Sequence, residues 1–208
     1  TLLMARLRAA SRSADRPSCE CEMKTRIAVL ISGSGTNLQS IIDRSESGDL
    51  PVEIACVISD REKAFGLERA RKHGIPAYFV GPKSYVRRED HEEAVISLLE
   101  DHGVRLVVLA GYMRLITPLM LGRYRDRIIN IHPALLPSFP GTDGYGDAWR
   151  YGVKVSGCTV HFVDEGCDTG PIILQAVNPV EENDTLESFR ERGLKIEPKV
   201  LPEAIKLY

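Results

Sequence analysis

The chain has 208 residues, of which 43% are hydrophobic and 27% are charged, and its formal net charge is −2 at pH 7. About 100–200 residues per domain is usual, so this length predicts one globular domain with a sizeable core. The near-neutral charge gives no electrostatic footprint for nucleic acid, and no apolar run approaches the roughly 20 residues that a membrane-spanning helix needs. Composition therefore indicates a soluble protein that binds neither nucleic acid nor membrane.

The first 22 residues differ in composition from the rest of the chain. They are rich in Arg, Ser and Ala and show no clear period, and their three acidic residues disfavour an organellar transit segment. We expect residues 1–24 to be an N-terminal extension, disordered or of artificial origin, and residues 25–208 to form the functional domain. The five cysteines lack paired metal-ligand spacing, so we expect reduced thiols, no metal and a cytoplasmic protein.

An apolar run over residues 26–31 predicts the first strand, and a helical pattern begins near residue 38. Between them lies Ser32-Gly-Ser-Gly-Thr-Asn37, a glycine turn of the kind whose free N–H groups bind phosphate at a helix start. A second interpretation stays open, because Gly33-x-Gly35 is part of a dinucleotide fingerprint and Asp60 could imitate its ribose-binding acid. The turn is therefore a candidate site for a phosphate or for a nicotinamide dinucleotide.

Strands and helices alternate along the next part of the chain. The pattern predicts strands over residues 52–58, 75–80 and 106–110 and helices over residues 64–73 and 88–102. Such alternation is typical of βαβ units, so we predict an α/β, Rossmann-like, doubly wound and mainly parallel sheet with helices on both faces. Ligands on such sheets bind at the carboxyl ends of the strands, and Gly35, Gly111 and His132 each follow a strand run.

Asn130 and His132 stand two residues apart after the apolar run 127–129. Residues i and i+2 of an extended chain project to the same side, so the amide and the imidazole could both contact one reacting atom. The alternative interpretation is that the two residues merely mark the end of a strand.

The last third of the chain predicts smaller features. The glycine-rich tract 141–147 predicts a mobile loop, and strands near residues 156–163 and 172 predict an antiparallel C-terminal addition. We expect His161 to be a half-buried histidine of the first of these strands. Asp168 lies in Asp-Thr-Gly, a sequence that favours turns, and a final helix begins at Asp184-Thr185, either of which can cap it.

The segment Asn130-Ile-His-Pro-Ala-Leu-Leu-Pro137 resembles the signature of the folate-dependent formyltransferases. From about residue 26 to its end the chain resembles the phosphoribosylglycinamide formyltransferase branch of that family. The segments that carry this likeness are the Ser32 turn, Gly111-Tyr-Met-Arg-Leu-Ile116 and Asp164-Glu-Gly-Cys-Asp-Thr-Gly-Pro-Ile-Ile-Leu-Gln175.

The resemblance implies that Asn130 and His132 are catalytic and that Asp168 pairs with His132. A carboxylate near an imidazole favours its charged form and raises its pKa above the usual value of about 6.5. We therefore expect His132 to be a usable acid near neutral pH.

The resemblance also implies the reaction and the binding residues. The formyl group of the co-substrate 10-formyltetrahydrofolate would pass to the amine of 5'-phosphoribosylglycinamide in de novo purine (IMP) biosynthesis, without a metal, in a monomer or homodimer. The implied binding residues are Gly35, Thr36, Asn37 and Glu197 for the ribonucleotide and Arg88, Met113, Arg114, Leu115, Ile116 and Asn130 for the folate. At Arg88 the alternative is a solvated arginine, and at Met113, Leu115 and Ile116 it is a core side chain.

The chain departs from the family's pattern in the 141–147 tract, at Gly193, which weakens a helix by roughly 1 kcal/mol, and at Pro198. Two rival functions share much of the pattern. A formyl-folate hydrolase would use the same catalytic residues with water as the nucleophile, and a non-enzymatic nucleotide-binding module would bind without turnover. A transfer-RNA formyltransferase would need a further carboxyl-terminal domain.

Overall fold

The computed structural model describes residues 24–208. All of the expected N-terminal extension except Lys24 lies outside the described residues. Within residues 24–208, no helix is both long enough and apolar enough to cross a membrane.

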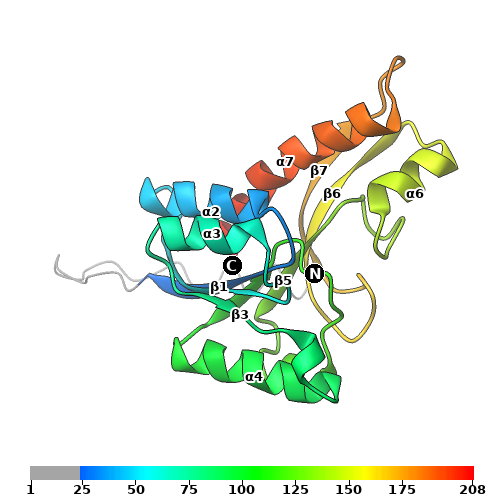
Figure 1. Cartoon of the computed structure of the whole chain (residues 1–208). Helices are drawn as coiled ribbons and strands as arrows, with labels where there is room; N and C mark the ends of the chain where they lie inside the picture. The colour runs from blue at the N-terminus through cyan, green and yellow to red at the C-terminus, as the bar shows by residue number, and fades with distance from the viewer. Residues whose placement is uncertain (1–23) are drawn as a thin grey trace, which may run out of the picture.

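The core of the fold is a seven-stranded sheet with the strand order β3-β2-β1-β4-β5-β6-β7 (Figure 1). The strands are β1 (Thr25–Ile31), β2 (Val52–Ser59), β3 (Ala77–Phe79), β4 (Leu106–Leu109), β5 (Ile128–His132), β6 (Val155–Phe162) and β7 (Ile172–Pro179). Neighbouring strands from β3 to β5 are parallel, whereas β6 pairs antiparallel with both β5 and β7. The predicted Rossmann-like sheet with an antiparallel addition is confirmed.

Helices cover both faces of this sheet (Figure 1). The helices are α2 (Thr36–Glu46), α3 (Phe65–Lys72), α4 (Arg88–Asp101), α5 (Pro118–Arg123), α6 (Gly144–Tyr151) and α7 (Leu186–Leu207), with a 3-10 turn η1 (Pro82–Ser84). The apolar residues of α2, α3 and α7 pack on one face, and those of α4 and α5 pack on the other.

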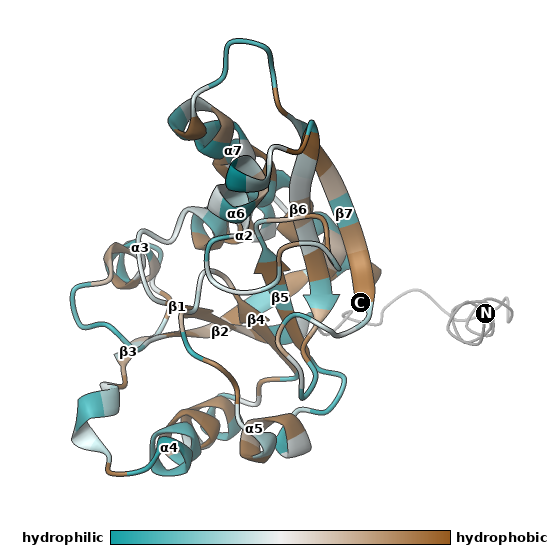
Figure 2. Cartoon of the chain, turned by 90° about the vertical axis from the view of Figure 1, so that its right-hand side faces the viewer, coloured by the Kyte–Doolittle hydropathy of each residue, from teal (hydrophilic) through white to brown (hydrophobic). Residues whose placement is uncertain are grey.

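The alternation of a strand explains the two layers of core. Along β1, Ile27 and Val29 point into the first layer, while Ala28 and Leu30 point into the second. Because both faces are covered, the central strands read as continuous apolar runs rather than as alternating ones. Figure 2 shows these mostly hydrophobic strands between helices in which hydrophobic and hydrophilic residues alternate.

Helix α7 begins where the sequence predicts. Thr185 accepts a hydrogen bond from the Ser188 N–H at 3.2 Å, and the Ser188 hydroxyl accepts one from the Thr185 N–H at 3.0 Å. This reciprocal pair satisfies two N–H groups that the first turn leaves without partners. The helix then continues past Pro198, so this departure from the family's pattern lies inside a helix.

The expectation of a mobile loop over residues 141–147 is wrong. Helix α6 begins at Gly144, and the Asp143 carboxylate caps it by accepting the Gly146 N–H at 3.3 Å. Tyr145, which follows, is 3% exposed. Burial of this side chain and the cap hold a glycine-rich segment in a helix.

Candidate active site

Strand β5 carries Asn130 and His132 at the carboxyl edge of the parallel sheet. Its neighbour β6 places His161 opposite Asn130 and Thr159 opposite His132. Both residues of β5 line one cavity, as expected for residues i and i+2 of a strand. They lie within the strand rather than after its end, so the rigid backbone of a central strand fixes their positions.

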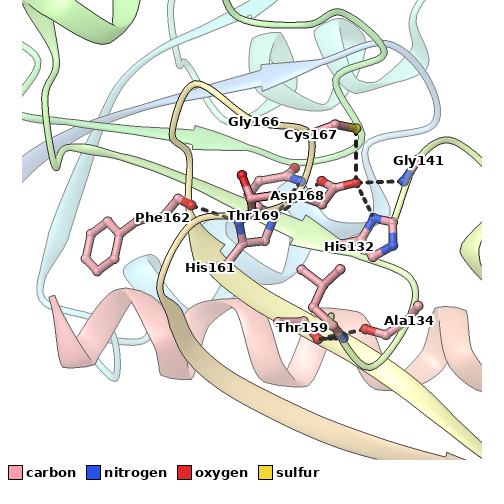
Figure 3. Close-up of polar contacts among 12 residues, drawn as sticks. His132, Ala134, Gly141, Thr159, His161, Phe162, Gly166, Cys167, Asp168 and Thr169 are labelled. Carbon is pink, nitrogen blue, oxygen red and sulfur yellow. Dashed lines mark hydrogen bonds and ion pairs between the residues drawn. The ribbon is translucent and has the colours of Figure 1, made fainter. Parts of the chain in front are cut away.

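Asp168 lies in the loop between β6 and β7, with a positive φ of 57°. Its Oδ2 is 3.3 Å from His132 Nδ1 and accepts the Gly141 N–H at 2.8 Å (Figure 3). Its Oδ1 is 3.5 Å from His161 Nε2. Burial alone would raise the pKa of Asp168, but the hydrogen bonds from His161 and Gly141 and the two imidazole charges hold that pKa at about 2. Asp168 is therefore an anion, and the predicted proximity to His132 is present.

Both ring nitrogens of His132 face oxygen acceptors. Nδ1 faces Asp168, and Nε2 donates to the Phe139 carbonyl at 2.8 Å. A neutral imidazole has one N–H and could donate to only one of these oxygens, whereas an imidazolium donates to both. The contacts of His132 are therefore those of a proton donor.

The pKa of His132 nevertheless differs from the expectation. His132 is 2% exposed, and burial lowers its pKa below the ordinary value although Asp168 and the Phe139 carbonyl act in the opposite direction. The prediction of a raised pKa is wrong, because the loss of hydration of the imidazolium outweighs one neighbouring carboxylate.

His161 belongs to the same group of side chains, and sequence reasoning missed it. It is 2% exposed, not half-buried. Its Nδ1 donates to the Phe162 carbonyl at 2.8 Å, and its Nε2 lies 3.3 Å from Asn130 Nδ2. The available signal was the alternation of Thr159 and His161 on a strand beside Asn130, but the register that brings them together is not local in sequence.

A cavity of about 410 Å³ opens beside these residues, within the size range of small-molecule sites. Asn130, His132, Asp168 and the whole segment Gly111–Ile116 line it. Met113 and Leu115 are 61% and 64% exposed, so they are apolar surface available to a ligand rather than core. This placement brings four of the predicted folate residues to the catalytic group.

Arg88 lies behind the cavity wall. It is absent from the lining residues, and its Nη2 donates to the Leu115 carbonyl at 3.2 Å. In this arrangement Arg88 supports the backbone of the lining segment.

Ser32 fixes the same segment to the sheet. Its N–H donates to the Gly111 carbonyl at 3.1 Å, and its hydroxyl accepts the Met113 N–H at 2.9 Å and donates to Asp60 Oδ1 at 2.6 Å. Ser32 is 3% exposed. Asp60 thus accepts, at Oδ1, a hydrogen bond from the residue that holds the cavity wall.

The glycine turn before α2 is tightly packed. Gly35 has a φ of 71°, and a Cβ on it would lie 2.6 Å from the Gly66 Cα. Gly66 in turn donates its N–H to the Gly33 carbonyl at 3.1 Å. Glycine is therefore required at position 35 by the backbone alone, whatever the turn binds.

Two predicted ribonucleotide residues meet at this turn. Asn37 Nδ2 donates to Glu197 Oε2 at 2.9 Å, which joins the start of α2 to α7. Neither residue belongs to the lining of the 410 Å³ cavity. The structure thus divides the predicted residues into a cavity group and a turn group.

No group of three or more potential metal ligands occurs within residues 24–208.

The Rossmann-like sheet places an amide and a histidine–aspartate pair beside a small-molecule cavity. This arrangement is consistent with a group-transfer enzyme. Residues 25–205 match the family model described as formyl transferase. The chain belongs to the formyl transferase family, as the Asn130–Pro137 segment predicted.

Particular members of the family are similar to this chain over most of its length. Phosphoribosylglycinamide formyltransferase of Bacillus subtilis (strain 168) is 46% identical over 181 residues, which are 87% of this chain and 93% of that protein. The trifunctional purine biosynthetic protein adenosine-3 of Chironomus tentans is 45% identical over 186 residues, and the match covers 88% of this chain and 14% of that protein. The crystal structure of glycinamide ribonucleotide transformylase 1 from Symbiobacterium toebii is 50% identical with a TM-score of 0.88, covering 93% of this chain and 91% of that one.

Proposed function

We propose that this chain transfers the formyl group of 10-formyltetrahydrofolate to the amine of 5'-phosphoribosylglycinamide, giving 5'-phosphoribosyl-N-formylglycinamide and tetrahydrofolate in de novo purine (IMP) biosynthesis. The observation that carries the proposal is the contact of His132 Nδ1 with Asp168 Oδ2 at 3.3 Å, beside Asn130 at the wall of the cavity. Relatives named for this reaction cover most of the chain.

The chemistry follows from donors placed against developing charge. The amine attacks the formyl carbon, a C–N bond forms, and the carbonyl electron pair moves onto oxygen. Asn130 and His132 donate hydrogen bonds to that oxyanion, and each such donor typically contributes about 3–4 kcal/mol. The oxyanion pair then re-forms the carbonyl, the bond to N10 breaks and its electron pair leaves with N10, which takes up a proton, while the former amine loses one.

The neighbours of Asn130 and His132 prepare them for this role. His161 Nε2 lies between the Asn130 amide at 3.3 Å and Asp168 Oδ1 at 3.5 Å, and its Nδ1 donates to the Phe162 carbonyl, so His161 fixes the Asn130 amide against the carboxylate. Asp168 favours the charged form of His132 against the effect of burial. Both neighbours act on orientation or charge and need not contact the substrate.

The two groups of residues suit the two substrates. The folate would lie along Met113, Arg114, Leu115 and Ile116, with Arg88 supporting that wall from behind. The ribonucleotide phosphate would bind the turn at Gly35, Thr36 and Asn37, where the first N–H groups of α2 are free. Glu197, beside Asn37, would lie near the amino end of the ribonucleotide.

The test is a turnover assay with purified protein. Formyl-folate should be consumed only when glycinamide ribonucleotide is present, with equal amounts of formylated product and tetrahydrofolate. Consumption without the ribonucleotide would instead indicate a hydrolase, and binding of both ligands without turnover would indicate a binding module. Size-exclusion chromatography would distinguish the predicted monomer from the predicted homodimer. A cytoplasmic location and the absence of a metal requirement stay predictions.

A further inference from the structure

Tyr145 and Gly193 fit each other across two helices. Tyr145 of α6 is 3% exposed, and its ring meets Phe189 of α7 edge-on at 5.7 Å between centroids. A Cβ on Gly193 would lie 2.3 Å from Tyr145 Cζ and 2.5 Å from its hydroxyl oxygen. The tyrosine ring therefore occupies the space that a side chain at position 193 would need. This contact links two of the positions at which the chain departs from its family's pattern.

The hydroxyl group of Tyr145 forms a hydrogen bond with the carboxyl group of Glu197. It donates to Glu197 Oε1 at 3.1 Å, while Glu197 Oε2 accepts a hydrogen bond from the Asn37 amide at 2.9 Å. Glu197 is 7% exposed, so these two donors replace most of its hydration. A buried carboxylate held by two fixed donors is confined to one orientation.

Two titratable groups are coupled to Glu197: Tyr145 from α6 donates a hydrogen bond to it, and the charge of Glu197 raises the pKa of Cys158 from β6. Burial raises the pKa of Cys158 to about 12 and raises that of Tyr145 above its ordinary value, so both are uncharged. Burial also raises the pKa of Glu197, and the hydrogen bonds from Asn37 and Tyr145 oppose this rise. Hydrogen bonds from neutral groups therefore favour the anionic form of Glu197.

We propose that Tyr145 is a positioning residue for the ribonucleotide site, acting through Glu197 on Asn37, and that Gly193 is the residue that admits it. The inference rests on the proposed function, which places Asn37 and Glu197 in that site. The tyrosine hydroxyl holds one oxygen of the Glu197 carboxyl group and so directs the other at Asn37, which holds the Asn37 amide at the turn before α2.

The test compares Tyr145→Phe with the unchanged protein. The variant keeps the ring that packs on Gly193 and removes only the donor. The dissociation constant of glycinamide ribonucleotide, measured by calorimetry, should rise by about tenfold or more, as for a lost hydrogen bond to a charged group. The loss should grow as pH is lowered from 8 towards 5, because Glu197 without this donor has a higher pKa and becomes protonated sooner. KM for the ribonucleotide should rise while KM for formyl-folate stays unchanged.

Two further variants make the result specific. Tyr151→Phe removes a hydroxyl from the same helix at a side chain that is 80% exposed, and it should leave both dissociation constants unchanged. Glu197→Gln should abolish the pH dependence, and adding Tyr145→Phe to it should produce little further loss, because the tyrosine acts through the carboxylate.

An unchanged ribonucleotide dissociation constant and pH profile in Tyr145→Phe would overturn the inference. Equal losses of ribonucleotide and folate affinity with a lower melting temperature would also overturn it, because they would make Tyr145 a packing residue. Binding is measured without turnover, so the inference and the proposed reaction fail separately. A protein that binds the ribonucleotide but transfers no formyl group refutes only the reaction.

Discussion

Burial lowers the pKa of His132, and the negative charge of Asp168 offsets part of that effect. We predict that Asp168→Asn lowers the pKa of His132 further, because the variant removes the negative charge that favours the imidazolium. Turnover that needs the imidazolium should then decline at a lower pH than in the unchanged protein. At neutral pH the variant should be slower, and it should recover in part as pH falls. NMR titration of the His132 ring and the pH dependence of turnover measure this, and an unchanged His132 pKa would make Asp168 a turn residue.

Asn130→Ala and His132→Ala should each reduce turnover by at least about 100-fold, because each removes a donor to the oxyanion. Folding should survive both changes. His73→Ala is a matched control, because His73 contacts Glu46 at the surface and should leave turnover unchanged. Near-normal turnover in either active-site variant would remove that residue from the catalytic group.

The sequence was sufficient to single out residues that the structure brings together, and insufficient for their environment. Asn130, His132 and Asp168 stand in short contiguous motifs, and the structure brings them together. His161 joins them only through the pairing of β5 with β6, which no local pattern specifies. The sign of the His132 pKa shift depends on burial, and burial of one side chain is a property of the assembled fold.

At the scale of elements, the segment Gly111–Ile116 depends on one hydroxyl. We predict that Ser32→Ala weakens folate binding by several-fold, because the Met113 N–H loses its acceptor and Asp60 loses its donor. Ribonucleotide affinity should change much less. Calorimetry with each ligand separates the two effects, and Ser47→Ala, which alters an exposed hydroxyl at the end of α2, is the control. Equal losses for both ligands would refute a local role of Ser32.

Gly35→Val is a poor test of whether the turn binds a phosphate. The valine Cβ would overlap the Gly66 backbone, so the variant would disturb the contact of α2 with α3 before it affected any ligand. Thr36→Ala changes a side chain of the same turn without this overlap.

The long alternating elements were predictable because periodicity is a local property, and β1, β2, α4 and α7 agree with their patterns to within a residue or two. Helix α6 was not predictable in this way. Helix α6 contains Gly144 and Gly146, which are poor helix formers, and its cap and the burial of Tyr145 override that preference. Gly193 likewise looked like a weakness of α7 until its neighbour from α6 was known.

At the scale of the whole molecule, Asp168 contributes to stability as well as to the site. Its pKa in the folded chain is about 2, against an ordinary value of 3.8. A carboxyl group whose pKa is lowered in the folded chain stabilises the fold by about 2 kcal/mol at pH values above its ordinary pKa. This contribution is lost as pH falls towards the pKa of the folded chain. We predict that the difference in unfolding free energy between the unchanged protein and Asp168→Asn shrinks as pH is lowered. Urea unfolding at several pH values measures it, and a constant difference would show that ionisation of Asp168 does not contribute.

Glu197 has the opposite effect on stability to Asp168, because burial raises its pKa. The folded chain holds that proton more tightly than the unfolded chain, so this residue costs stability once pH exceeds its unfolded value. Retaining such a carboxylate is consistent with a role in binding rather than in folding.

The Phe139 carbonyl accepts the His132 Nε2–H. This internal acceptor lets the site favour the transition state over the bound substrate. A substrate oxygen that is to receive this hydrogen bond must compete with a peptide carbonyl of the protein. The formyl oxygen of the folate is itself an amide oxygen, so exchanging one for the other gains almost nothing in the ground state. The oxyanion formed during transfer accepts a charge-assisted bond about twice as strong. In the proposed reaction we therefore expect His132 to contribute to the rate of formyl transfer and not to the affinity for formyl-folate, since only a contact stronger in the transition state accelerates a reaction.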